Sequence, residues 1–205
     1  MPTDDLLGHR VVVFASALIY WGGVGLQARR VRHQIGRSPN VAPQGTKERL
    51  LWAGWFLVVA GWMAQPFLAG GDQALPGLKL HAAWIRFGTS AFGMSLVVAG
   101  YIGTLWCYAA MGRTWRMGID RREQTALVTH GPYRWVRHPI YLFQVVMLLG
   151  VLLLLPTAVS LGLMLLHLVC VGFKVADEEA HLMSVHGSIY RDYVARTGRL
   201  LPRLW

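Results

Sequence analysis

The stretch 137–179, RHPIYLFQVVMLLGVLLLLPTAVSLGLMLLHLVCVGFKVADEE, decides how this chain folds. It contains two apolar runs, 139–155 and 157–176, which are separated only by Pro156 and its uncharged neighbours. Each run is near the length that a helix needs to cross about 30 Å of hydrocarbon. The short uncharged turn predicts a tight antiparallel helical hairpin. Such a hairpin would return the acidic residues at its end to the cationic residues at its start.

The composition of the whole chain predicts an all-α integral membrane protein. Of the 205 residues, 54% are apolar and only 15% are charged, which is too apolar for a soluble domain. Lipid offers no partner to backbone N–H and C=O groups, so membrane-spanning segments must be helices here. Three further apolar runs bring the predicted transmembrane helices to five: 11–28, 49–69, 84–111, 139–155 and 157–176.

The distribution of the basic residues predicts the topology. Segments 29–49, 112–138 and 174–203 together contain 17 of the 20 Lys and Arg residues. Five spans place all three segments on one side, so that side is cytoplasmic and the N-terminus lies outside. We expect the inner membrane of a bacterium as the location. The net charge of +10 could indicate a nucleic-acid-binding protein, but the cations flank apolar segments instead of forming a basic domain.

The cationic stretch 130–141, HGPYRWVRHPIY, leads into the hairpin. Gly131-Pro132 is a turn signal, and Pro139 suits the first turn of a helix. The first amides of that helix have no partner inside it, and Arg137 and His138 add cationic groups, so the stretch predicts an anion site. The alternative is that these residues only anchor a membrane helix at the water boundary, where such side chains are common.

Three consecutive acids, 177–179, follow the last apolar run. Acids at the end of a span are often simply solvated. If the hairpin instead returns Glu178 and Glu179 to Arg137 and His138, cations could bind a ligand carboxylate and an acid could bind ribose hydroxyls. The nearby aromatic rings could stack on a base. S-adenosylmethionine has a carboxylate, ribose hydroxyls and a base, and NADPH has the ribose and the base. These rings belong to Tyr133, Trp135 and Tyr141.

The run 127–141, LVTHGPYRWVRHPIY, resembles the core motif of the isoprenylcysteine carboxyl methyltransferase family. The later Glu178, Glu179, Leu182, Gly187, Tyr190 and Tyr193 occur at family-like spacing, so the resemblance covers about residues 105–205. It implies one membrane domain over 1–205, with two N-terminal helices in 1–83 and a methyltransferase core in 84–205. It also implies that S-adenosylmethionine binds at the cytoplasmic face and leaves as S-adenosylhomocysteine.

The resemblance further implies roles for individual residues. Glu179, with Glu178, would bind the ribose. Independently of the resemblance, an amine or thiol acceptor would have to lose a proton, and His130 or a glutamate could then assist. Arg113 and Trp115 would contact the substrate, although their surroundings match the family pattern only loosely. Where family members often have glycine, this chain has Phe143. The cofactor pocket would be lined by Val128, His130, Gly131, Tyr133, Arg137, His138, Pro139 and Tyr141.

Several functions remain open from the sequence. The family default is O-methylation of an isoprenylcysteine-type carboxylate, and a phospholipid amine or a small thiol is an alternative acceptor. A membrane reductase would use NADPH, for which only Arg121-Arg122 offers a spare cation pair. A non-catalytic lipid-binding scaffold is the third class. We expect membrane lipids and a lipophilic substrate as partners, and no metal site, with Cys107 and Cys170 as free thiols.

The run 84–111 is rich in small residues, including Gly93, Gly100 and Gly103. Small residues allow neighbouring membrane helices to approach closely, within one chain or between two copies. The oligomeric state therefore stays open.

Overall fold

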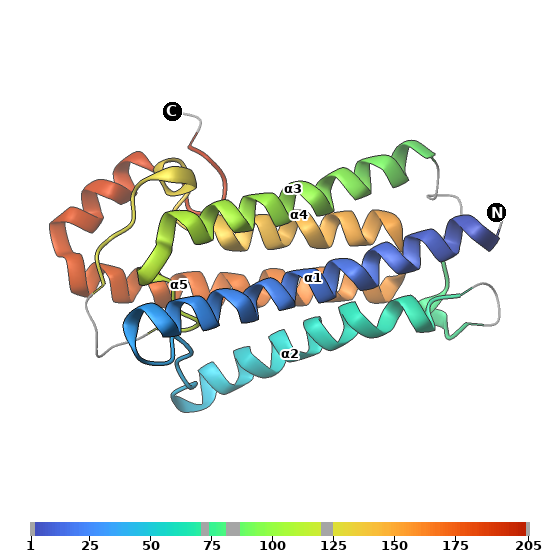
Figure 1. Ribbon diagram of the computed structural model, residues 1–205, viewed down its shortest axis with the longest axis horizontal. Helices are drawn as coiled ribbons and strands as arrows, with labels where there is room; N and C mark the ends of the chain where they lie inside the picture. Colours follow the sequence, from blue (N-terminus) through green and yellow to red (C-terminus); the bar gives the residue numbers. More distant parts are fainter. Residues whose placement is uncertain (1–2, 71–73, 81–86, 120–124, 204–205) are drawn as a thin grey trace.

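Five long helices form a bundle in the computed structural model, which describes residues 3–70, 74–80, 87–119 and 125–203 (Figure 1). They are α1 (Thr3–Ile35), α2 (Gly45–Leu68), α3 (Phe87–Met111), α4 (Pro139–Leu154) and α5 (Ala158–Arg196). Within these described ranges, β-structure is limited to three isolated bridges, which confirms the predicted all-α class. The first three residues of the predicted span 84–111, and the Arg121-Arg122 pair, lie outside the described residues.

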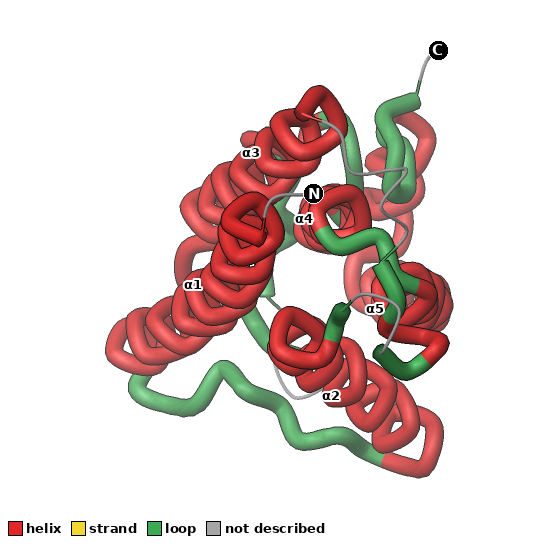
Figure 2. The backbone as a smooth tube through the Cα atoms, turned by 90° about the vertical axis from the view of Figure 1, so that its right-hand side faces the viewer, coloured by secondary structure: helices red, strands yellow, loops and turns green. Residues whose placement is uncertain are grey.

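Four of the helices, α1, α2, α3 and α5, are long and apolar enough to cross a membrane. The helix α4 has 16 residues, which corresponds to about 24 Å and is shorter than a typical hydrocarbon core. It lies among α1, α3 and α5 when the bundle is viewed end-on (Figure 2). Its residues Met147, Val151 and Leu154 are at most 1% exposed. The apolar run at 139–155 thus forms a helix as expected, and its crossing of the membrane stays a prediction.

Glycines of α3 let it pack directly against α4. A Cβ added to Gly100 would lie 2.7 Å from the carbonyl oxygen of Phe143, and one on Gly93 would lie 3.0 Å from that of Gly150. The ring of Phe143 fills the space over Gly103. The small-residue face predicted for this segment is therefore used inside the chain, where it accommodates the ring of Phe143.

The segments rich in Lys and Arg gather at one end of the bundle. The α1–α2 loop, the α3–α4 connector and the C-terminal part of α5 lie together at the left of Figure 1, and the N-terminus lies at the right. This arrangement agrees with the alternation of the cations along the sequence. Which side of a membrane this end faces remains a prediction.

The helix α5 continues well beyond the predicted span end at 176. It starts at a cap in which the Thr157 hydroxyl accepts a hydrogen bond from the backbone N–H of Ser160 at 3.0 Å. Ser160 also donates to Gln65 of α2 at 2.6 Å, which fixes the hairpin turn. Near its far end, Gly187 has φ = +52°, a conformation that glycine adopts readily, and the last turns bend away there. The helical extension carries the acids 177–179 as a rigid part of the hairpin.

Candidate functional site

The motif 130–138 is held between the end of α3 and the C-terminal tail. Gly131 begins a 3₁₀ turn, Gly131–Arg134, with φ = +60°, and a Cβ there would lie 3.0 Å from that of Ala110. Both facts favour glycine at this position. The hydroxyl of the buried Tyr193 donates to the carbonyl oxygen of Tyr133 at 2.7 Å. The end of α5 therefore supports the turn from one side and α3 supports it from the other.

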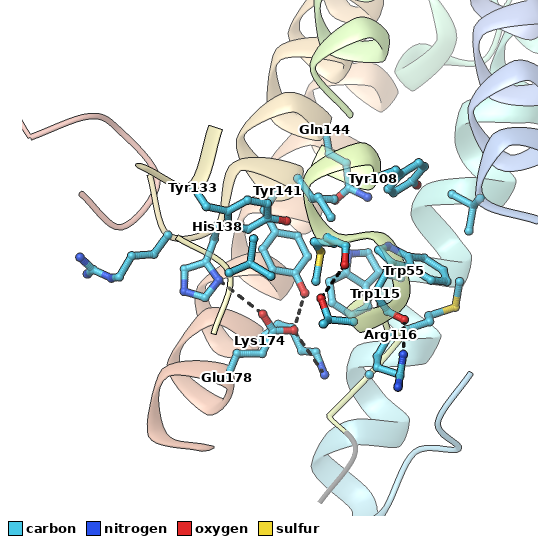
Figure 3. A pocket seen from close by; sticks show the side chains of 18 of the residues that line it. Trp55, Tyr108, Trp115, Arg116, Tyr133, His138, Tyr141, Gln144, Lys174 and Glu178 are labelled. Carbon is cyan, nitrogen blue, oxygen red and sulfur yellow. Dashed lines mark hydrogen bonds and ion pairs between the residues drawn. The ribbon is translucent and has the colours of Figure 1, made fainter. Parts of the chain in front are cut away.

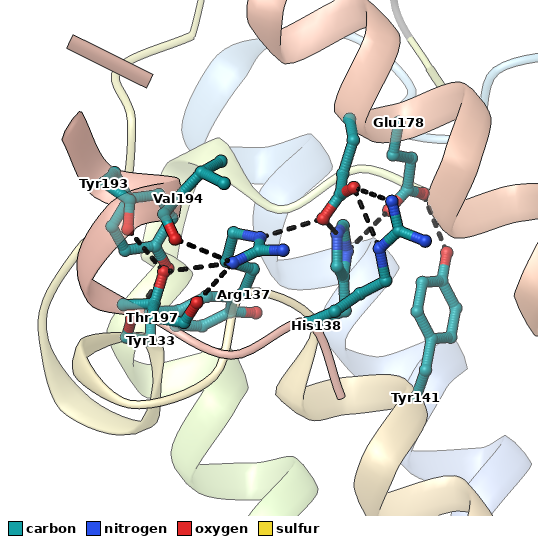
Figure 4. Close-up of polar contacts among 10 residues, drawn as sticks. Tyr133, Arg137, His138, Tyr141, Glu178, Tyr193, Val194 and Thr197 are labelled. Atoms are coloured by element: carbon teal, nitrogen blue, oxygen red, sulfur yellow. Dashed lines mark hydrogen bonds and ion pairs between the residues drawn. The ribbon is translucent and has the colours of Figure 1, made fainter. Parts of the chain in front are cut away.

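The tail after α5 pairs with the motif as a short parallel bridge. The backbone N–H of Arg137 donates to the carbonyl of Gly198 at 2.8 Å, and that of His138 donates to Arg199 at 3.1 Å. The Arg137 guanidinium also donates to the carbonyl oxygens of Val194 and Thr197 (Figure 4). The tail thus fixes the position of both cationic residues of the motif.

The structure brings the acidic end of the hairpin to its cationic start (Figure 4). Nε of Arg137 donates to Oε1 of Glu179 at 2.8 Å, and Arg199 also donates to this carboxylate. Glu178 accepts a hydrogen bond from the Tyr141 hydroxyl at 2.7 Å and lies 3.4 Å from Nδ1 of His138. Nε2 of His138 also lies 3.4 Å from Oε1 of Glu179, so the two acids share His138 and otherwise have different partners.

His138 lies between the two carboxylates, and its side chain is 4% exposed. Burial alone would lower the pKa of His138, but hydrogen bonds and charges from Glu178 and Glu179 outweigh it and raise this pKa above 6.5. The imidazole therefore holds its positive charge more readily than a solvated histidine. His138 therefore adds positive charge to that of Arg137 at the start of α4.

A cavity of about 490 Å³ opens beside this cluster (Figure 3). Seven predicted site residues line it, and the other five do not. The lining members are Val128, Tyr133, Arg137, His138, Tyr141, Glu178 and Trp115. The members off the wall are His130, Gly131, Pro139, Glu179 and Arg113, of which His130 and Arg113 are exposed. Glu178, and not Glu179, is thus the acid on the cavity wall.

Sequence reasoning missed the part of the wall that α1 and α2 supply. The Trp55 ring stacks on Tyr141 at 6.2 Å between centroids and 13° between planes, and Figure 3 shows Trp55 and Trp115 opposite His138. Lys174 of α5 is a further wall residue that was not predicted. The other wall residues from α1 and α2 are Tyr20, Trp21, Val24, Trp52, Phe56, Val58, Val59 and Trp62. The signal in the sequence was the cluster of aromatic residues at helical spacing in 49–69, which we interpreted only as a span.

Two further expectations concern metal and thiols. In the part of the chain that the structure describes, no group of three or more His, Cys, Asp or Glu side chains could hold a metal ion. Cys107 and Cys170 are both free and buried, as small apolar groups would be.

A sequence family and a solved structure are similar to this chain. Residues 93–184 match the sequence model of the isoprenylcysteine carboxyl methyltransferase (ICMT) family. The solved structure of a eukaryotic intramembrane Ras methyltransferase, ICMT, aligns with a TM-score of 0.53 at 20% identity. That alignment covers 79% of this chain and 54% of the other. It shows a shared fold, and together with the apolar helices it indicates an integral membrane protein.

Two curated relatives match in sequence. A nickel-cobalt-cadmium resistance protein, NccN, of Alcaligenes xylosoxydans xylosoxydans is 31% identical over 59% of this chain and 53% of its own length. A cobalt-zinc-cadmium resistance protein, CzcN, of Cupriavidus metallidurans is 29% identical over 62% of this chain and 55% of its own. The chain spans about half the length of these relatives. The family match over residues 93–184 and the shared fold support a place for this chain in the isoprenylcysteine carboxyl methyltransferase family.

Proposed function

We propose that this chain is a membrane methyltransferase that uses S-adenosylmethionine to methylate a lipophilic carboxylic acid. The observation that carries the proposal is Glu178, an acid on the wall of a largely apolar cavity, positioned by Tyr141 and His138. The family match suggests an isoprenylcysteine-type carboxylate as the default acceptor.

The residues of the cavity fit the parts of this cofactor. Oε1 of Glu178 accepts from Tyr141 and has Nζ of Lys174 at 3.9 Å, and Oε2 lies near His138. Both oxygens keep lone pairs that can accept from ribose hydroxyls. The side chains of Arg137 and His138 supply positive charge for an amino-acid carboxylate. The ring of Tyr133, which lines the cavity, offers a surface on which a purine can stack. The volume of about 490 Å³ lies in the range of small-molecule sites.

When bound, S-adenosylmethionine supplies an already activated methyl group. The protein's task is then to align an acceptor oxygen with that group and to exclude water from it. The aromatic wall formed by Trp55, Trp115 and Tyr141 excludes water on the side facing α2. A carboxylate acceptor has no proton to lose, so it needs no general base. This agrees with His130, which is exposed and lies off the cavity wall.

The charges of the wall favour an acid over an amine as acceptor. Arg116, Arg137 and Lys174 line the cavity together with a single carboxylate, that of Glu178. Nζ of Lys174 lies 3.9 Å from Glu178, and its side chain is 8% exposed. A buried cation gains most from an anionic ligand, whereas a cationic phospholipid amine would be repelled. Arg116 and Lys174 thus extend the positive lining beyond the predicted motif.

Calorimetric titration of the detergent-solubilised protein with S-adenosylhomocysteine tests the proposal. Glu178→Gln removes the charge that binds the ribose, and we expect affinity to fall about 10- to 100-fold, because charge-assisted hydrogen bonds contribute about 1.5–3 kcal/mol. Asp177→Asn is the matched control, since Asp177 pairs with the exposed Lys47 away from the cavity. No binding by the wild type, or equal affinity in the Glu178→Gln variant, would contradict the proposal.

A further inference from the structure

The cavity carries polar atoms that no residue of the described chain satisfies. Three of them are Nε2 of His167 on α5, Oε1 of Gln144 on α4 and Nε1 of Trp21 on α1. All three atoms are buried without a hydrogen-bond partner, and all three side chains line the cavity. The His167 residue as a whole is only 3% exposed. A buried polar atom left unpaired is costly, so three of them on side chains that line one cavity indicate a ligand that pairs with them.

These atoms lie deeper in the bundle than the acid–cation cluster. His167 precedes Glu178 by 11 residues on α5, which corresponds to about 16 Å along the helix axis. Gln144 follows Tyr141 by one helical turn on α4 and lies beyond Tyr141 in Figure 3. His167 and Gln144 therefore line the part of the cavity that would hold the body of a lipophilic acceptor, not its reacting end.

The wall around Gln144 and Trp21 has few other polar groups that could pair with them. The Gln144 amide nitrogen donates to the Tyr20 hydroxyl at 2.5 Å, which directs its carbonyl oxygen elsewhere as a free acceptor. Trp21 offers a donor. Apart from these groups, the neighbouring wall is apolar or aromatic: Val24, Val58, Val59, Trp62 and Leu148.

We infer that the acceptor is an amphiphile whose apolar body carries a hydroxyl or similar hydrogen-bonding group some way from its acidic head. A hydroxyl can donate to Gln144 and accept from Trp21 or His167, whereas a plain hydrocarbon or isoprenyl chain pairs with none of them. A site built around such a group discriminates strongly against ligands that lack it. This inference rests on the proposed function, because it specifies the acceptor of the same site.

Matched fatty acids test the inference through the fluorescence of the tryptophans that line the cavity. The probes are octadecanoic acid, 10-hydroxyoctadecanoic acid with a mid-chain hydroxyl, and 2-hydroxyoctadecanoic acid as the positional control. We expect the wild type to bind the 10-hydroxy acid about fivefold or more tightly than the other two, since one net hydrogen bond is worth about that factor. His167→Leu and Gln144→Leu should each reduce this preference, and the double variant should abolish it.

A buried polar residue off the cavity provides the control variant. Thr104 is 1% exposed and donates only to its own helix, to the carbonyl of Gly100 at 2.9 Å. Thr104→Val should leave the preference for the 10-hydroxy acid unchanged. Equal binding of the three acids by the wild type, no binding of any, or a preference that survives in the double variant would overturn the inference.

The two proposals fail in different ways. If S-adenosylhomocysteine binds through Glu178 while the fatty acids show no preference, only the acceptor inference falls. If the preference depends on His167 and Gln144 while S-adenosylhomocysteine does not bind, the methyltransferase proposal falls and a polar lipophilic ligand remains.

Discussion

The charge of Glu179 should hold the C-terminal tail to the motif, and Glu179→Gln is the variant that measures its contribution. The Glu179 carboxylate binds Arg137 at 2.8 Å, with side chains only 14% and 8% exposed, and it also binds Arg199. Arg137 in turn holds carbonyl oxygens at the end of α5. Loss of the carboxylate charge leaves a nearly buried guanidinium without its counter-charge.

The expected destabilisation follows from those contacts. Removing one partner of a buried ion pair costs about 3–5 kcal/mol. Glutamine keeps the shape and still accepts one hydrogen bond, and Arg137 keeps its carbonyl partners, so we expect about 2–3 kcal/mol. For a chain of this size, that corresponds to a fall in Tm of about 5–10 °C.

Thermal unfolding in detergent micelles, followed by circular dichroism, measures this effect. The matched control is Asp177→Asn, because the Asp177–Lys47 pair has side chains that are 30% and 56% exposed. Such a surface pair contributes about 0.5 kcal/mol, so Tm should hardly change. Equal Tm values for Glu179→Gln and the control would refute the structural role assigned to Glu179. Increased proteolysis of residues 197–203 in Glu179→Gln would show which segment is released.

Three further predictions concern stability. The pKa of His138 is higher in the folded protein than in the unfolded chain, so its protonation stabilises the fold fully below about pH 6.5. This stabilisation is lost as the pH rises through the folded-state pKa. Unfolding measured against pH should show the loss in the wild type and not in His138→Gln. Gly100→Val would force side-chain atoms against α4 and should cost about 3 kcal/mol in unfolding experiments, whereas Gly22→Ala, with no atom within 4 Å, should be neutral or slightly stabilising. Tyr193→Phe leaves the buried carbonyl of Tyr133 without its donor and should lower the unfolding free energy by about 1–3 kcal/mol. Raising the pH should not restore the stability that this variant loses.

The sequence was sufficient for the features that depend on periodicity and local chemistry. The length of the apolar runs and the uncharged turn at Pro156 specify a helical hairpin, because only a helix satisfies its backbone in an apolar environment. The hairpin alone then brings the acids 177–179 near the stretch 130–138, as the structure shows. The glycines of α3 likewise predicted a close contact with a neighbouring helix, and α4 makes this contact.

Only the tertiary structure decided which side chains share the cavity. The neighbours Glu178 and Glu179 look equivalent in sequence, but they point about 100° apart around the helix, so one faces the cavity and the other faces Arg137 and Arg199. The Trp55 ring of α2 reaches Tyr141 of α4 across 86 residues of sequence because both helices pack against α5. Such contacts depend on how helices rotate and pack against one another, which periodicity within each helix leaves undetermined.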